Sequence, residues 1–118
     1  MRRADSIEVE PEAARVALER IVRRIVDAVA PEKIVLFGSA ARGTMKPSSD
    51  FDLLVIKSGD YHHIDLAQQI YMAIGPREFA VDITVATPEE VERYRGEPCL
   101  VIYPALREGK VVYDVRAA

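Results

Sequence analysis

Two carboxylates stand two positions apart in this chain of 118 residues, shortly after a glycine–serine pair. Asp50 directly precedes the apolar run 51–56 and Asp52 is its second residue. Residues i and i+2 of a strand point to the same face. Two carboxylates on one face repel each other unless a cation lies between them. Mg²⁺ that bridges carboxylates to substrate phosphates is the usual partner. The spacing therefore predicts a metal site at Asp50 and Asp52.

The glycine–serine pair indicates a phosphate site beside the metal. Gly38 follows the apolar run 34–37 and would form a tight corner, and Ser39 would open a short helix. Free N–H groups at such a corner attract phosphate oxygens. Ser39 could instead be an ordinary helix cap, but the carboxylates downstream favour phosphate binding. Arg42 is either an exposed helix residue or a ligand of a triphosphate oxygen. A Walker P-loop is excluded, because Thr-Met follows Gly43 where that motif requires Lys and Ser or Thr.

A third carboxylate lies in a later apolar segment. Residues 79–86 alternate large apolar residues with small or polar ones, which predicts a half-buried strand, with Asp82 in its middle. An acid inside a strand is disfavoured by propensity and by desolvation, so it calls for a metal, a base role or an ion pair. If this strand lies beside that of Asp52, the three acids cluster.

Other reactive side chains favour structural interpretations. His62 and His63 have no Cys or His partner at a metal-ligand spacing, so zinc is not expected, and we place them on the surface. Cys99 is the single cysteine, which excludes an internal disulfide and indicates a small core residue.

Composition restricts the class of protein. The net charge of −3 and the pI near 5.4 argue against direct nucleic-acid binding, which normally needs a basic excess. The N-terminus lacks an apolar signal region, and no apolar run approaches the length of a membrane span. We therefore expect a cytoplasmic protein that forms one domain over residues 1–118.

The elements follow from periodicity and from helix and strand breakers. Pro11 opens a helix with one apolar stripe that Pro31 stops, and Thr87 caps a short helix through a capping box with Glu90. The stripe of a helix over 62–74 is expected to contain Ile64, Ala67, Tyr71 and Ile74. Further predicted elements are strands over 33–37, 51–57, 78–86 and 110–113, a short helix after Ser39, and a helix over 100–106.

The glycine–serine corner through Gly43, the acidic run from Ser49 to Val55 and Asp82 together resemble the nucleotidyltransferase superfamily of DNA polymerase beta. The likeness is strongest to the minimal nucleotidyltransferase (MNT) antitoxins paired with HEPN toxins, and covers about residues 20–113. It implies an α/β fold with a small mixed β-sheet, the acids on one face and the helices packed on the other face.

The resemblance also implies a reaction. ATP would be the substrate, two Mg²⁺ ions would be held by Asp50, Asp52 and Asp82, and Gly38 with Ser39 would hold the β- and γ-phosphates. Asp82 would also help to deprotonate the acceptor. For the minimal antitoxins the acceptor is a tyrosine of a HEPN ribonuclease toxin, which AMP silences. The expected function is therefore a protein adenylyltransferase and type VII antitoxin.

Two other functions stay open from the sequence. The chain could neutralise a toxin by contact alone, with the acids unused, although the complete set of acids argues against this. It could also adenylylate a small molecule such as an aminoglycoside, although the chain has no room for an acceptor domain. The sequence does not fix the nucleotide preference, the modified residue or the oligomeric state.

Overall fold

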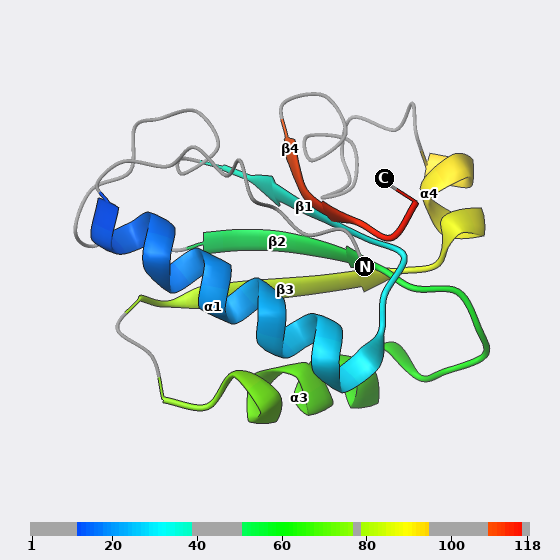
Figure 1. Ribbon diagram of the computed structural model, residues 1–118. Coiled ribbons are helices and arrows are strands. Elements are labelled where there is room, and N and C mark those ends of the chain that lie inside the picture. The colour runs from blue at the N-terminus through cyan, green and yellow to red at the C-terminus, as the bar shows by residue number, and fades with distance from the viewer. Residues whose placement is uncertain (1–11, 39–50, 77–78, 95–108, 117–118) are drawn as a thin grey trace.

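The computed structural model describes residues 12–38, 51–76, 79–94 and 109–116 (Figure 1). Within these ranges the elements are α1 (Glu12–Val29), β1 (Lys33–Phe37), β2 (Phe51–Ile56), α3 (His63–Ile74), β3 (Val81–Ala86), α4 (Pro88–Tyr94) and β4 (Lys110–Asp114). The strands form one mixed sheet in the order β3-β2-β1-β4. The α/β class expected from the sequence is confirmed.

Strand directions decide which ends of the chain segments meet. β1 is antiparallel to both β2 and β4, whereas β2 is parallel to β3 through the crossover helix α3. The start of β2 therefore lies beside the start of β3 and the end of β1. Phe37, Asp52 and Asp82 are register partners at that end of the sheet.

The predicted strand limits need small corrections. β1 has its predicted bounds, β2 ends one residue early, and β4 extends one residue further to Asp114. β3 begins at Val81, where the ladder opens with the Phe51 N–H donating to the Ala80 carbonyl. Asp82 is consequently the second residue of its strand, and its side chain is exposed, so the expected position in the middle of a half-buried strand is wrong.

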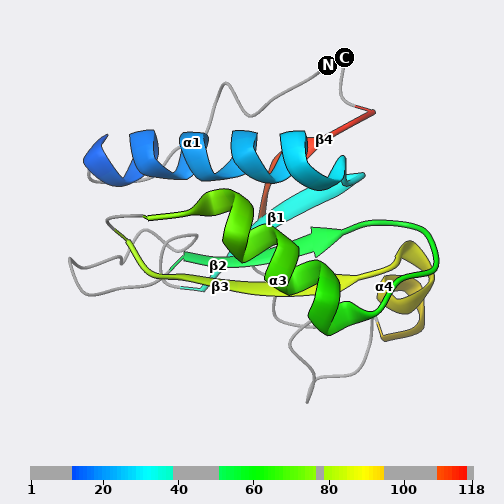
Figure 2. The ribbon, with the colours of Figure 1, turned by 90° about the horizontal axis from the view of Figure 1, so that it is seen from below.

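Helices α1 and α3 cover one face of the sheet (Figures 1 and 2). The apolar stripe of α1 is buried as predicted and packs on the odd-numbered residues of β2, such as Leu53 and Val55. Arg24 of α1 donates from Nη1 to the carbonyl oxygen of Ile74 at 2.7 Å, which satisfies a free carbonyl at the end of α3. The two helices thus form one layer over the core.

The buried side of α3 differs from the prediction. Leu66, Ile70 and Ile74 are buried, whereas Ile64 is 61% exposed. The helix is rotated because it packs against both α1 and β3. Tyr71 faces β3, where its hydroxyl oxygen accepts a hydrogen bond from the Ile83 N–H at 2.9 Å. This contact satisfies a backbone donor on the edge strand of the sheet.

The short helix α4 packs on the face opposite α1 and α3. Its Val91 joins a second apolar cluster with Val35, Leu54, Ile56 and Ala86. The predicted capping box is present, because the Thr87 N–H donates to Glu90 Oε1 at 2.8 Å and the Glu90 N–H donates to Thr87 Oγ1 at 3.1 Å. α4 is therefore fixed at the end of β3.

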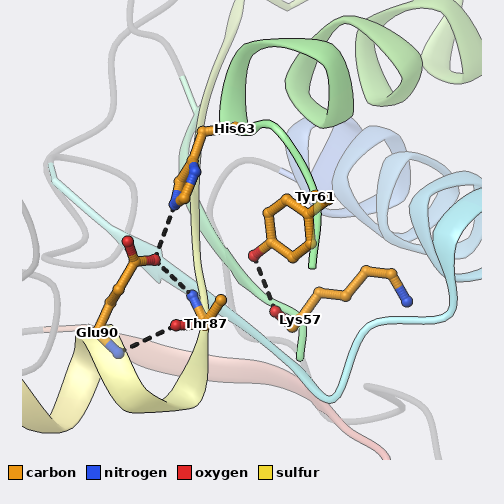
Figure 3. Close-up of polar contacts among 5 residues, drawn as sticks. All are labelled: Lys57, Tyr61, His63, Thr87 and Glu90. Carbon is orange, nitrogen blue, oxygen red and sulfur yellow. Dashed lines mark hydrogen bonds and ion pairs between the residues drawn. The ribbon is translucent and has the colours of Figure 1, made fainter. Parts of the chain in front are cut away.

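A contact between two residues that are far apart in the sequence joins α4 to α3 (Figure 3). His63 Nε2 lies 2.8 Å from Glu90 Oε1. Beside it, the Tyr61 hydroxyl donates to the Lys57 carbonyl oxygen at 2.8 Å, and burial with nearby glutamates raises the pKa of Tyr61 to about 12. The phenol thus stays protonated and able to donate at neutral pH.

Several predictions fall on residues outside the described ranges. These are Ser39 with the short helix after it, Arg42, Asp50, Cys99 and the helix over 100–106. Among the described helices, none has the combination of length and apolar character that a bilayer crossing requires.

The contacts of Glu90 predict a pH dependence of stability. The hydrogen bond from the Thr87 N–H and the contact with His63 lower the pKa of Glu90 from its ordinary 4.5. A carboxyl with a lowered folded-state pKa stabilises the fold above its unfolded-state pKa and loses that contribution as the pH falls below it. The unfolding free energy of Glu90→Gln should therefore fall less between about pH 6 and pH 3.5 than that of the unmodified chain.

Glu89→Gln is the matched control, since Glu89 is an exposed acid in the same turn of α4. Denaturant unfolding at each pH measures the difference. Parallel pH profiles for Glu90→Gln and the unmodified chain would contradict the assigned contacts.

Candidate functional site

The described part of the site lies on the face of the sheet opposite α1 and α3. Side chains alternate between faces, so Asp52 and Leu54 share one face of β2, while Phe51 and Leu53 pack under α1 and α3. Asp82 shares the Asp52 face, since the two are register partners on adjacent parallel strands. The two acids thus stand side by side on this face, as the sequence predicts for adjacent strands.

The environments of the two acids differ. Asp52 lies on an inner strand and is half-buried, whereas Asp82 lies on the edge strand β3 and is exposed. Neighbouring strands are about 4.8 Å apart, so the two carboxylates repel each other when both are ionised. Such a pair suits a cationic ligand, with Asp52 held in place and Asp82 accessible from the sheet edge.

Gly38 brings the turn after β1 against Asp52. Its φ of +79° lies in the region that side chains other than glycine rarely adopt. A Cβ atom at this position would overlap with Asp52 Oδ2. Gly38 therefore allows the carboxylate of Asp52 to approach the backbone of the turn. The predicted corner without a side chain is present, and the carboxylate is its close neighbour.

The donor set fits a hard divalent cation. Asp52 and Asp82 offer carboxylate oxygens from adjacent positions on one face, and Mg²⁺ prefers such ligands together with phosphate oxygens and water. Within the described residues no three His, Cys, Asp or Glu side chains gather. The third predicted ligand, Asp50, lies outside those residues, as do Ser39 and Arg42 of the predicted phosphate site.

The sequence did not reveal two contacts of α3. Tyr71 holds the N–H of Ile83, the residue after Asp82, and His63 reaches Glu90 from 27 positions away. No local pattern could have shown these contacts, because each depends on how α3 is rotated. The surface position expected for His62 and His63 is confirmed.

Comparison with known proteins gives a consistent result. A model of the nucleotidyltransferase domain family matches residues 17–114. Among solved structures, the chain is similar to a protein from Sulfolobus solfataricus proposed to be a nucleotidyltransferase. The TM-score is 0.61 at 21% identity, over 88% of this chain and 86% of the other. No curated protein matches the chain by sequence.

Two further similar structures are of toxin–antitoxin proteins. One is a toxin–antitoxin with AMP-PNP, with a TM-score of 0.53 at 22% identity, over 82% of this chain and 73% of the other. The other is a variant of the toxin–antitoxin MntA-HpeT in which two aspartates two positions apart are replaced by glutamate. Its TM-score is 0.52 at 20% identity, with the same coverage. At these identities the likeness shows the fold.

The contact between Gly38 and Asp52 predicts an unequal effect of two alanine substitutions. Gly75→Ala is the matched control, since Gly75 has a φ of +68° and a Cβ there would lie 3.6 Å from Arg24 Nη1, an ordinary contact. Gly75→Ala should lose the roughly 1–3 kcal/mol of a backbone conformation that is essentially restricted to glycine. Gly38→Ala should lose more and should also displace Asp52.

Denaturant unfolding measures the first effect, and the amide resonances of Asp52 and Asp82 report the second. Equal losses for the two variants, with unchanged resonances, would contradict the close approach of Asp52 to Gly38.

Proposed function

The chain belongs to the nucleotidyltransferase domain family, and on that basis we propose that it transfers AMP from ATP to a tyrosine hydroxyl of a HEPN-family toxin, acting as its antitoxin. The observation that carries this proposal is the pair Asp52 and Asp82, adjacent on one face of the sheet and next to the Gly38 turn. A glycine corner offers backbone donors to phosphates, and paired carboxylates offer ligands to the cation that accompanies a triphosphate.

The reaction divides roles between the residues. The acceptor oxygen attacks the α-phosphorus of ATP, its proton leaves, and the bond from that phosphorus to the bridging oxygen of the β-phosphate breaks, releasing pyrophosphate. Asp82 is exposed at the sheet edge, where an acceptor can approach, so it is the candidate to take the proton. Asp52 is half-buried against the turn, so it suits a role in binding ATP, which donates the AMP group.

Magnesium is part of this proposal. Asp52 and Asp82, with Asp50 as the third ligand, would hold two Mg²⁺ ions, which neutralise the triphosphate and stabilise the charge of the leaving pyrophosphate. Gly38, Ser39 and Arg42 would bind the phosphates. The chain's own contribution is to hold ATP against β2, while Asp82 on β3 stays exposed to the acceptor.

The similar structures support the choice of acceptor. Two of them are toxin–antitoxin proteins, one with the ATP analogue AMP-PNP. The variant aspartates of the other have the spacing of Asp50 and Asp52. Adenylylation of a small molecule is the second candidate for the same donor site, whereas neutralisation by contact alone would leave the adjacent acids without a use.

Asparagine substitutions separate the two acids. Asp52→Asn should abolish Mg²⁺-dependent ATP binding in calorimetry, because it removes a carboxylate ligand at the turn. Asp82→Asn should retain ATP binding and slow AMP transfer by roughly a hundredfold or more, as expected for loss of a general base. Asp65→Asn, on the exposed side of α3, is the control and should change neither property. ATP affinity that is equal with and without metal would contradict the site.

The acceptor is tested with ATP labelled on the α-phosphate. The chain alone with Mg²⁺ should incorporate little label, and addition of a HEPN toxin encoded beside it should give a labelled toxin with the mass of one or more AMP groups on tyrosine. Asp52→Ala should abolish this label and the protection of cells. Protection that persists without a mass change on the toxin would favour neutralisation by contact.

A further inference from the structure

A cavity of about 480 Å³ lies at the other end of the acid-bearing face. Its lining includes Ile56 and Lys33, which are register partners, and Val91 of α4. Ile56 is four residues from Asp52 along β2, which is about 13 Å in a strand. Leu54 and Val35 lie between the two places and are buried, so the cavity is separate from the site of the acids.

Both acids that line the cavity already have partners. Glu32 accepts hydrogen bonds from the backbone N–H and the hydroxyl of Ser58. Partial burial opposes ionisation, but these bonds outweigh it and lower the pKa of Glu32. Asp114 accepts the Arg116 N–H at 3.0 Å and lies 3.8 Å from Lys33 Nζ. The carboxylates of Glu32 and Asp114 are therefore already stabilised without a cationic ligand.

The two cations retain free donors. The guanidinium of Arg116 forms no hydrogen bond or ion pair with the residues that the structure describes, and Lys33 has one long ion pair there. The side chain of arginine carries five N–H donors and that of lysine three, and neither side chain can accept a hydrogen bond. The unused hydrogen-bonding capacity of the cavity is thus that of positively charged donors, which suits an anionic oxygen ligand.

The remaining lining selects among anions. Ile56 and Val91 are each 7% exposed, and Pro88 and the half-exposed Val115 complete an apolar wall. The two cations and the two acids, Glu32 and Asp114, balance in charge. The lining therefore offers no surplus positive charge to compensate for the second charge of a dianionic phosphate, whereas a singly charged carboxylate needs less compensation.

We propose that this cavity binds a carboxylate attached to an apolar group, with the charge on Arg116 and Lys33 and the apolar part against Ile56, Val91 and Val115. A free aliphatic acid and the C-terminal residue of a polypeptide share this chemistry. The volume lies in the range of small-molecule sites. The inference does not depend on ATP, magnesium or the acids of the other site.

The test is a titration of the ¹⁵N-labelled chain followed by NMR, without nucleotide or Mg²⁺. N-acetyl-leucine should give saturable shifts at the amides of Lys33, Ser58 and Arg116, and N-acetyl-leucinamide, which lacks the charge, should bind about tenfold more weakly or not at all. Arg116→Gln should weaken the binding of N-acetyl-leucine by about tenfold. The control Arg23→Gln, at an exposed position of α1, should leave it unchanged.

The peptide acetyl-Ala-Ala-Leu distinguishes the sources of the carboxylate. Tighter binding of the peptide than of N-acetyl-leucine assigns the cavity to a polypeptide end, and equal binding assigns it to a free acid. The proposal is overturned by a lack of saturable shifts, by equal binding of acid and amide, or by tighter binding of isopentyl phosphate than of N-acetyl-leucine. None of these results depends on AMP transfer.

Discussion

The parallel, in-register pairing of β2 with β3 is the constraint on which the rest of the structure depends. Phe51, Leu53 and Val55 must face the core under α1 and α3, and the period of two then sends Asp52 to the opposite face. Val81 and Val85 of β3 must likewise face the core, so Asp82 between them faces the opposite side. A slip of one residue would remove the valines from the core and separate the acids. The hydrophobic pattern therefore places Asp52 and Asp82 on the same face, and the register of the two strands sets them side by side.

The neighbouring acids oppose the stability of the sheet that holds them. Like charges on adjacent strands are unfavourable, and here one of them is half-buried. Gly38 adds a backbone conformation that other residues rarely adopt and lets Asp52 approach the turn more closely than any side chain would allow. Unfavourable features that coincide at one end of a sheet are expected where a ligand compensates for them. This convergence supports the site more strongly than either feature alone.

Much of the fold could be predicted from the sequence, because local patterns determine it. Proline and glycine breakers and apolar periodicity give α1 and β1 their limits, and the capping box of Thr87 and Glu90 gives α4 its start. The rotation of α3 could not be predicted, since it depends on simultaneous packing against α1 and β3. For the same reason, the sequence concealed the partner of His63.

The candidate site was predictable in part. The types and spacing of the carboxylates indicate a cation, and alternation assigns each one to a face. Their register is a property of two strands separated by a helix, and no local signal specifies it. The exposure of Asp82 likewise depends on where β3 begins, which the alternation over 79–86 placed too early. Distances between elements are thus what the structure adds.

The face that bears the acids has two ends with different electrostatics. One end carries Asp52 and Asp82 beside a turn and suits a cation, and the other carries balanced charges that include Arg116 and Lys33. About 13 Å of strand separates them, and the screening length at physiological salt is about 8 Å. Direct electrostatic effects between solvent-exposed groups at the two ends are therefore weak. Any coupling between ligands at the two ends has to pass through β2, whose residues Leu54 and Ile56 are packed in the same apolar cluster as Val91.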